Sequence, residues 1–402
     1  MSLCFHVYFS NQKDSGKIEF LGKGMDRFLS YPLRTTSHVE RLRKQVKKNH
    51  HILLIGYLGG GTSLLGDILG TRNTSFYLYE PLHYMARFGY FKPGYQCSMK
   101  TGNCWKNNQT SDQAIRTVQA IFNCDYDHYN HTVQWWQVRL SGAAGKVNDR
   151  NWNISSSRCN RTCLMKYLKL CSHYDSIVSK IPRVSVSLAS QLLNKFSNLN
   201  IIHLLRDPRA IMNSRNKYDW TPVPGGAIAL CNKMADDFLE SVKLKRVYPG
   251  RFYTVFYEDM VTDPFETFKY IYTFAGYNFN ADEQLRINKK TRNSQNIAWG
   301  WRNIIDHNVL KETNKACSHL YSLLGYPQVR NIEEIRNRSF PLRLKTGSQE
   351  DQWQEDIKDD KQSTERNRKK RRGEKCVGEG VLMGGDGIRC ISHFSTFKSV
   401  SQ

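Results

Sequence analysis

Short apolar runs alternate with segments of helical periodicity through the middle of the chain. Five of these runs are only four to six residues long and are apolar almost throughout, a pattern typical of strands buried on both faces of a sheet. We expect strands at residues 51–56, 76–79, 176–181, 200–205 and 251–256.

Between these strands, apolar residues spaced three or four apart predict helices. The predicted helices occupy or begin within residues 64–69, 184–196, 207–215, 227–248, 264–276 and 306–324. Strands that alternate with helices predict an α/β fold in which helices flank a mostly parallel sheet on both faces.

The pattern weakens at three places. Residues 1–48 are polar and basic without periodicity, which indicates a stem-like or irregular leader. Residues 93–165 are rich in Asn, Ser and Cys and predict a loop-rich, cysteine-containing insertion with some helix. Residues 344–402 carry charge clusters and a glycine-rich end, and we expect them to form a disordered tail. One domain is therefore expected at residues 49–343.

The composition of the chain predicts that it binds an acidic partner. The chain has 402 residues, 40% of them hydrophobic, enough for one large core or two smaller ones, and a formal net charge of +23. Such a charge favours nucleic acid, a membrane surface, a phosphorylated cofactor or an anionic polysaccharide. Part of the excess lies in two short basic runs, 41–48 and 366–372, which are typical of solvated segments. No recognition-helix, zinc or aromatic RNA motif accompanies the charge, so a nucleic-acid-binding protein is the weakest alternative.

Cysteines and glycosylation sequons favour an oxidising compartment. Eleven cysteines without two C-x-x-C pairs at zinc spacing fit disulfides better than a metal site, and we expect no metal. Cys159, Cys163 and Cys171 are close enough in sequence to pair locally. N-x-S/T sequons begin at Asn73, Asn108, Asn130, Asn153, Asn160 and Asn337. The first fifty residues contain no apolar stretch of about 18 residues. Either a membrane anchor lies upstream of this start, which we favour, or the protein is not luminal.

A glycine-rich turn follows the first predicted strand. Its sequence, Gly59-Gly-Gly-Thr-Ser-Leu64, precedes a helix start, where backbone N–H groups and the helix dipole favour a phosphate. No Lys precedes Thr62, so the G-K-[ST] element of nucleotide triphosphatases is absent. An ordinary tight connection between a strand and a helix remains an equal alternative on this segment alone.

A second segment, residues 201–215, repeats the arrangement of a buried strand followed by a helix start. Arg206 lies at the end of the strand and Ser214 two turns into the helix, while Asp207 is a candidate cap with Pro208 at the first helical position. A guanidinium and a hydroxyl that converge there suit a phosphate monoester. The alternative for Arg206 is a surface ion pair.

The pairing of these two segments resembles the two phosphosulfate-binding motifs of the Golgi carbohydrate 6-O-sulfotransferases. The second segment matches the family pattern L-x-R-D-P-R-A-x-x-x-S-R from Leu204 to Arg215. The resemblance covers residues 50–328. Its further matches are Tyr79-Glu-Pro-Leu-His83, Lys180-Ile-Pro-Arg183, Tyr257-Glu-Asp-Met260 with Asp263-Pro264, Trp301-Arg302, and Cys317 ahead of Leu324-Gly-Tyr326.

This resemblance implies a P-loop-like sulfotransferase fold and a PAPS-dependent enzyme. The enzyme would move a sulfuryl group from 3′-phosphoadenosine 5′-phosphosulfate (PAPS) to a sugar hydroxyl, the 6-hydroxyl of galactose, N-acetylglucosamine or N-acetylgalactosamine. It further implies the Golgi lumen, a glycan or glycosaminoglycan acceptor, no nucleic-acid partner, and membrane contact only through an anchor outside this chain. A disulfide between Cys231 and Cys317 is also implied.

The resemblance assigns roles to individual residues. Glu80 would be the base that takes the acceptor proton, with a structural ion pair as its alternative, and His83 would assist or be a buried structural histidine. Tyr257 would lie near the cofactor or have a packing role, as would Arg302, and Asp259 and Asp263 would cap or brace the turn after the last predicted strand. The implied cofactor-binding residues are Gly59, Gly60, Gly61, Thr62, Ser63, Leu64, Arg206, Ser214 and Arg302.

The first motif departs from the family at one position. The family loop reads R-[ST]-G-S-S-F, and Gly59 stands where its arginine would be. Losing a cation that neutralises charge in the transition state lowers a rate by about 100- to 1,000-fold. Gly59 therefore raises the alternative of a catalytically impaired protein that binds only cofactor or glycan. We expect Lys180 or Arg183, which follow a predicted strand, to supply the missing cation.

Overall fold

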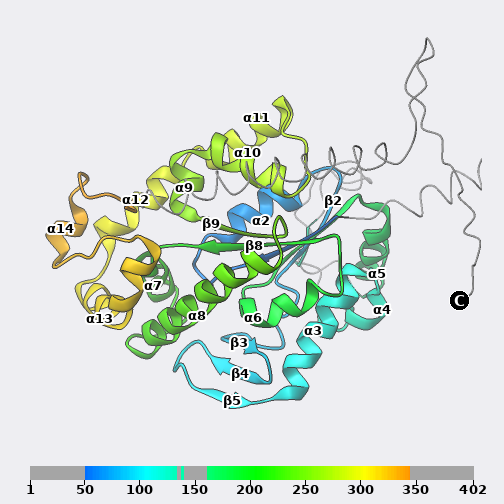
Figure 1. Cartoon of the computed structure of the whole chain (residues 1–402), viewed down its shortest axis with the longest axis horizontal. Coiled ribbons are helices and arrows are strands. Elements are labelled where there is room, and N and C mark those ends of the chain that lie inside the picture. Colours follow the sequence, from blue (N-terminus) through cyan, green and yellow to red (C-terminus); the bar gives the residue numbers. More distant parts are fainter. Residues whose placement is uncertain (1–49, 134–136, 140–160, 345–402) are drawn as a thin grey trace, which may run out of the picture.

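The computed structural model describes residues 50–133, 137–139 and 161–344 (Figure 1). The predicted leader, the predicted tail beyond residue 344 and Cys159 lie outside these ranges. Within them, one sheet has six strands and a second has three.

The larger sheet has the strand order β6-β2-β7-β1-β8-β9, and all neighbouring pairs are parallel except β2 with β6. Its strands are β1 (His50–Ile55), β2 (Ser75–Tyr79), β6 (Val138–Arg139), β7 (Ser176–Lys180), β8 (Leu199–Leu205) and β9 (Phe252–Phe256). The five parallel strands are the five predicted ones, each within one residue at either end, which confirms the α/β fold. β1 lies between β7 and β8 and is parallel to both. The segments that follow β1 and β8 therefore begin side by side at the carboxyl-terminal edge of the sheet.

Helices cover both faces of this sheet (Figure 1). Those in the first half of the described chain are α2 (Thr62–Gly70), α3 (Asn108–Phe122), α4 (Tyr126–Tyr129), α5 (Arg161–Leu168) and α6 (Val186–Ala189), with 3-10 turns at Lys169–His173 and Ser190–Leu192. Those in the second half are α7 (Pro208–Lys217), α8 (Gly225–Val247), α9 (Tyr257–Thr262), α10 (Pro264–Phe274), α11 (Ala281–Thr291), α12 (Ser294–Ile304), α13 (His307–Leu324) and α14 (Ile332–Arg336).

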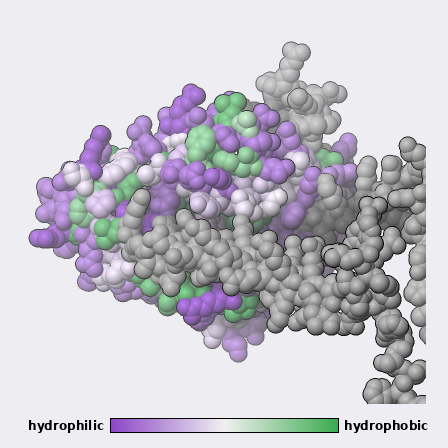
Figure 2. All heavy atoms as spheres, turned by 45° about the horizontal axis from the view of Figure 1, so that its top comes forward, coloured by the Kyte–Doolittle hydropathy of each residue, from purple (hydrophilic) through white to green (hydrophobic). Residues whose placement is uncertain are grey.

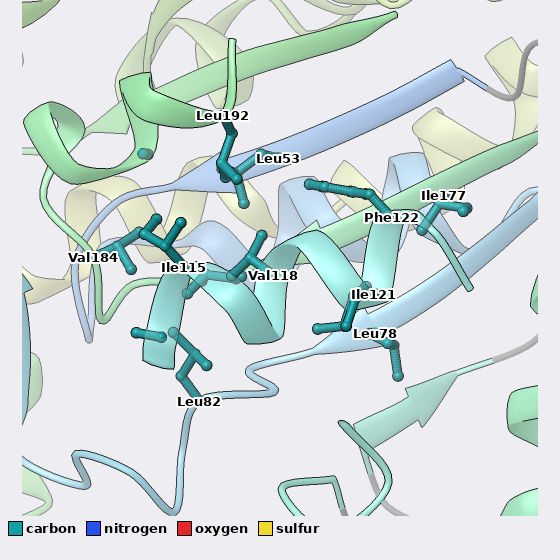
Figure 3. Close-up of a cluster of buried hydrophobic side chains, with 14 of the residues drawn as sticks. Leu53, Leu78, Leu82, Ile115, Val118, Ile121, Phe122, Ile177, Val184 and Leu192 are labelled. Carbon is teal, nitrogen blue, oxygen red and sulfur yellow. The ribbon is translucent and has the colours of Figure 1, made fainter. Parts of the chain in front are cut away.

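Alternation along each strand divides the core between the two faces. On one face, Leu53 and Ile177 pack with Val118 and Phe122 of α3 (Figure 3). On the opposite face, residues one position along each strand, such as Ile52, pack with α2, α9 and α10. A third apolar cluster joins α7, α8 and α13 beside the end of β8. The outer face that α10 and α11 present is largely hydrophilic with apolar side chains scattered in it (Figure 2).

The structure differs from the predicted elements in two regions. Residues 93–133 are more regular than the predicted loop-rich insertion, because they contain α3 and two strands of the small sheet, which is formed by β3 (Gly89–Lys92), β4 (Tyr95–Ser98) and β5 (Cys104–Lys106). The helix predicted at 184–196 is instead the four-residue α6 and a 3-10 turn. Ser185 and Ser190 interrupt the apolar spacing there, and their hydroxyls bond to local backbone groups.

Two glycines bring α2 unusually close to the sheet. A Cβ atom on Gly66 would lie 2.1 Å from the hydroxyl of Tyr77, and one on Gly70 would lie 2.3 Å from its ring. The Tyr77 side chain of β2 therefore fits into a notch on α2 that only two glycines one turn apart can form. This contact fixes the helix that follows the glycine-rich turn.

Three disulfides connect described residues: Cys97–Cys104, Cys124–Cys171 and Cys231–Cys317. The last, which joins α8 to α13, confirms the pairing implied by the family resemblance. Local pairing of Cys171 is wrong, because its partner Cys124 is 47 residues away at the end of α3. Cys171 belongs to the core cluster that α3 shares with the sheet and Cys124 packs against it, so tertiary packing brings them together rather than sequence proximity.

Removing the Cys231–Cys317 disulfide is expected to destabilise the protein more than removing Cys97–Cys104. The two bonds close segments with sequence separations of 86 and 7 residues, for which chain entropy gives about 4.5 and about 2.5 kcal/mol. Urea unfolding of the two Cys→Ala double variants measures this difference. Equal losses of unfolding free energy would show that loop length is not the governing factor.

Candidate active site

The glycine-rich turn links β1 to α2 and leaves the start of that helix open. Gly59 and Gly61 have φ angles of 83° and 86°, which other residues rarely adopt. Gly61 is the N-cap of α2 and no side chain caps the helix, so its first N–H groups have no side-chain acceptor there. Such an N-terminus attracts an anion. Thr62 is buried, whereas Ser63 and Leu64 are partly exposed.

The second segment is held by a buried ionic arrangement. Asp207 caps α7 by accepting a hydrogen bond from the Arg209 backbone N–H, and its carboxylate also pairs with the Arg209 guanidinium at 2.7 Å. The predicted cap and the position of Pro208 are thus present. Glu258 accepts a hydrogen bond from the Asp207 backbone N–H, and burial raises the pKa of Glu258 to about 7. These contacts fix the direction in which Arg206 leaves β8.

The two segments meet at Gly59. The Nη1 atom of Arg206 donates a hydrogen bond to the Gly59 carbonyl at 2.9 Å. A Cβ atom built on Gly59 would lie 3.4 Å from the Ser214 hydroxyl. Arg215 donates from Nε to the Leu58 carbonyl, also at 2.9 Å. The alternative of a surface ion pair for Arg206 is wrong, because this side chain is only 7% exposed and has no salt bridge among the described residues.

Tyr257 completes this junction. Its ring lies where a side chain on Gly61 would be, 2.3 Å from a Cβ atom built there, and the Arg206 guanidinium lies 4.3 Å from the ring centroid. The Nε atom of Arg206 is buried and has no hydrogen-bond partner among residues of the described ranges. A cationic donor with unused capacity therefore lies beside the open start of α2.

A second cluster surrounds Glu80, which follows β2. Its carboxylate pairs with both Lys180 and Arg183 and is only 6% exposed. Burial favours a higher pKa for Glu80, but the two cations outweigh burial and lower the pKa to about 2. Glu80 also has a positive φ of 50°, a backbone strain that often marks functional sites.

Lys180 and Arg183 differ in what else they reach. The Nζ atom of Lys180 lies 3.4 Å from the Ser63 hydroxyl, so this cation borders the start of α2. Arg183 instead donates to the carbonyls of Ala86 and Arg87. Of the two cations proposed to compensate for Gly59, the structure brings Lys180 to the loop and directs Arg183 away from it.

His83 lies one turn beyond Glu80 and is partly exposed. Its backbone N–H bonds to the Glu80 carbonyl, and its ring packs edge-on against Tyr84 at 5.2 Å. Burial, together with Arg183, lowers the pKa of His83 below 6.5, so the imidazole is neutral at physiological pH. The ring is partly exposed while its Nδ1 atom is buried, so an assisting role and a structural role both stay open for His83.

Arg302 does not join the other predicted cofactor-binding residues. It is fully buried on α12, and its two Nη atoms donate to the carbonyls of Phe340 and Pro341 at 2.8 Å. Asp259 pairs with Arg343, and Asp263 caps α10 as expected. These contacts favour the packing alternative for Arg302, while Tyr257 lies at the loop.

Two residues at the junction had no role in the sequence interpretation. Arg215 holds the loop through the Leu58 carbonyl. Its position at the end of the second motif could have indicated this role from the sequence. Tyr79 contacts Ser63 through its hydroxyl at 3.1 Å, which the strand pattern alone does not reveal. Among the described residues, no group of three His, Cys, Asp or Glu side chains forms a metal site, and no helix is long and apolar enough to cross a membrane.

Comparisons with known proteins agree with this geometry. Residues 52–281 match the sulfotransferase family. Carbohydrate sulfotransferase 1 of Danio rerio is 24% identical over 349 residues, which cover 73% of this chain and 81% of that protein. Carbohydrate sulfotransferase 4 of Mus musculus is 24% identical, covering 75% and 88%, and carbohydrate sulfotransferase 6 of Homo sapiens is 22% identical, covering 74% and 86%.

Solved structures also resemble the chain, at lower identity. The sulfotransferase domain from the curacin biosynthetic pathway is 13% identical with a TM-score of 0.38 and covers 70% of this chain and 99% of that one. A mouse sulfotransferase complexed with PAP is 13% identical with a TM-score of 0.32, covering 61% and 66%. The family match spans β1, the glycine-rich turn, the Glu80 cluster and the Arg206 segment, and this chain belongs to the sulfotransferase family of enzymes.

Proposed function

We propose that this enzyme transfers a sulfuryl group from PAPS to a hydroxyl of a glycan, the 6-hydroxyl of a hexose or hexosamine. The observation that carries the proposal is the junction at Gly59, where Arg206 and Ser214 meet the open start of α2. The names of the relatives support a carbohydrate acceptor. Three disulfides among the described residues fit an oxidising compartment and support the Golgi lumen.

The donor would lie across the junction. Backbone N–H groups of Gly61 to Ser63 and the Ser63 hydroxyl would hold the 5′-phosphosulfate, and Arg206 and Ser214 the 3′-phosphate. The unused Nε atom of Arg206 fits this assignment, because a phosphate supplies acceptors for a guanidinium. Residues 49–343 would form the sulfotransferase domain.

Transfer is an in-line displacement in which the acceptor oxygen bonds to sulfur while the bond from sulfur to the phosphate oxygen breaks. Negative charge grows on that leaving oxygen, and a fixed cation stabilises it. Lys180 is the proposed cation, since its Nζ atom borders Ser63 at 3.4 Å. Lys180 would therefore replace the arginine that the family loop carries at the position of Gly59.

The charges around Glu80 and His83 favour a division of their roles. A carboxylate with a pKa of about 2 that is paired with two cations is a weak base. His83 is neutral and partly exposed, and it can accept the acceptor proton. We therefore assign the role of base to His83. Glu80 instead positions Lys180, in place of the base role that the resemblance implies for it.

Two measurements test the function. One is the transfer of radiolabelled sulfate from PAPS to a panel of neutral and acidic glycans. The other is calorimetry of the binding of 3′-phosphoadenosine 5′-phosphate (PAP). We expect PAP binding and transfer to at least one glycan. PAP binding without any transfer would support the catalytically impaired alternative. No PAP binding, with salt-dependent retention by RNA but not by heparin, would support a nucleic-acid-binding protein.

The pH dependence of transfer tests the proposed base. Because the pKa of His83 is lowered, kcat/KM should stay high below pH 6.5 and fall only when the imidazole gains a proton. His83→Gln should lower kcat and remove this acid limb, while leaving PAP affinity unchanged. An acid limb that persists unchanged in His83→Gln would overturn the assignment of the base to His83.

A further inference from the structure

Four residues form a basic aromatic surface beside the Glu80 cluster. Tyr84 is 59% exposed, and Arg87 and Lys100 are also exposed. Both cations face the ring of Phe88, with Lys100 Nζ 4.6 Å and the Arg87 guanidinium 5.2 Å from its centroid. We call Tyr84, Arg87, Phe88 and Lys100 the lip.

Hydrogen bonds connect the lip to the proposed site of transfer. Arg183, which pairs with Glu80, donates to the Arg87 carbonyl at 3.2 Å and to the Ala86 carbonyl at 2.8 Å. Glu80 in turn pairs with Lys180, which borders Ser63. The lip therefore lies one hydrogen-bonded step from the cluster that would handle the acceptor hydroxyl.

The lip is also held in place before any ligand binds. The backbone N–H of Met99 donates to the Phe88 carbonyl at 2.8 Å, and the Cys97–Cys104 disulfide closes the turn that carries Lys100. The Ser98 hydroxyl accepts from the backbone N–H groups of Lys100 and Thr101. Lys100 is thus presented on a fixed turn, and the backbone carbonyl of Arg87 is held by Arg183.

The two cations of the lip have no acidic partner among the described residues. Within the described part of the chain, neither Arg87 nor Lys100 forms a salt bridge, whereas Lys92 nearby pairs with Asp236. The carboxylate of Glu80 is already shared between Lys180 and Arg183. The lip therefore offers two positive charges without an acidic partner among the described residues, together with the exposed ring of Tyr84.

We propose that the lip binds the acceptor and selects an acidic saccharide, whose carboxylates contact Arg87 and Lys100 while a sugar ring packs on Tyr84. Guanidinium and ammonium groups suit carboxylates, and an exposed aromatic ring suits the apolar face of a pyranose. This inference rests on the proposed glycan acceptor and names its class. Sugar residues flanking the acceptor hydroxyl would thereby fix its position.

Calorimetry with PAP bound tests the lip without requiring turnover. The ligands are an unsulfated chondroitin hexasaccharide and the same chain with its carboxylates reduced to hydroxymethyl groups. We expect wild-type protein to bind the acidic chain about two- to 30-fold more tightly, since two exposed charge contacts together give about 0.4–2 kcal/mol. The Arg87→Gln/Lys100→Gln variant should bind both chains with the same affinity.

A matched control is Lys289→Gln/Lys290→Gln, which removes the same charge from exposed positions at the end of α11. This control should keep the wild-type preference. Equal affinity of wild-type protein for the two chains would overturn the inference, as would a preference that survives Arg87→Gln/Lys100→Gln. Equally tight binding of a sulfated keratan oligosaccharide, which lacks carboxylates, would overturn the assignment to carboxylates.

The measurements distinguish a failure of the proposed function from a failure of the lip proposal. Loss of PAP binding, or the absence of transfer to every glycan, contradicts the sulfotransferase proposal whatever the lip does. Normal PAP binding and transfer, with an acidic-chain affinity that ignores Arg87 and Lys100, contradicts the lip alone.

Discussion

Lys180→Ala is expected to lower kcat for sulfuryl transfer by about 100- to 1,000-fold while PAP affinity changes by less than about threefold. The physical reason is that Gly59 offers no side-chain charge, so the cation beside Ser63 must stabilise the leaving oxygen. Folding should survive, because Glu80 keeps its ion pair with Arg183 after the substitution. Steady-state transfer of radiolabelled sulfate measures kcat, and titration with PAP measures the affinity.

Controls separate this role from a general loss of charge. Lys195→Ala removes an exposed lysine elsewhere and should leave kcat unchanged. Lys180→Arg keeps a cation and should recover part of the rate. An unchanged kcat in Lys180→Ala would end the proposal that Lys180 compensates for Gly59, and a melting temperature far below wild type would point to a structural role instead.

Arg206→Ala should weaken PAPS binding by about 10- to 150-fold. A hydrogen bond to a charged group contributes about 1.5–3 kcal/mol, and each 1.4 kcal/mol is a factor of ten. The guanidinium is buried against Tyr257 and already points at the glycine-rich turn, so little ordering is needed when a phosphate binds. Calorimetry with PAP measures the loss.

A ligand that lacks the 3′-phosphate provides the matching control. Adenosine 5′-phosphosulfate should bind wild type and Arg206→Ala almost equally, because the group that Arg206 contacts is missing from it. If Arg206→Ala weakened both ligands to the same extent, Arg206 would act by holding the Gly59 carbonyl rather than by binding the 3′-phosphate.

Introducing the family arginine at Gly59 is not a simple route to higher activity. The backbone has a φ of 83°, and a Cβ atom would lie 3.2 Å from the Ile211 carbonyl. Gly59→Arg therefore strains the turn at the point where Arg206 holds it. Its inactivity would say nothing about whether the wild-type enzyme is active.

The parallel strands were predictable because each is a short apolar run. A run that is apolar on both faces of a strand must be buried on both faces of a sheet. β6 is only two residues long, which is too short for a hydrophobic pattern to predict a strand. The small sheet is equally hidden, since β4 alternates exposed and buried residues weakly and β5 is exposed throughout. α11 buries only Ile287 and Thr291 over its length, which leaves no apolar stripe to find.

The candidate site divides in the same way. The glycine-rich turn and Arg206 could be proposed from the sequence because each directly follows a predicted strand, and Ser214 because it lies two turns into the helix after the second strand. Side-chain direction was not predictable: Lys180 and Arg183 lie three residues apart, yet only Lys180 reaches the loop. Arg302 matched a family position, but contacts from residues 340 and 341 decide where its guanidinium points.

The notch between α2 and Tyr77 matters for anyone who wishes to engineer a more robust enzyme. Replacing helix glycines with alanine is a standard stabilising choice, since alanine restricts the unfolded chain. At Gly66 and Gly70 that choice would push α2 off the sheet, because the Tyr77 side chain already fills the space. Gly300 in α12 has no atom within 4 Å of the added methyl group, so it is the helix glycine to replace. Consensus design that treats the three positions alike would move the start of α2 and, with it, the proposed anion site.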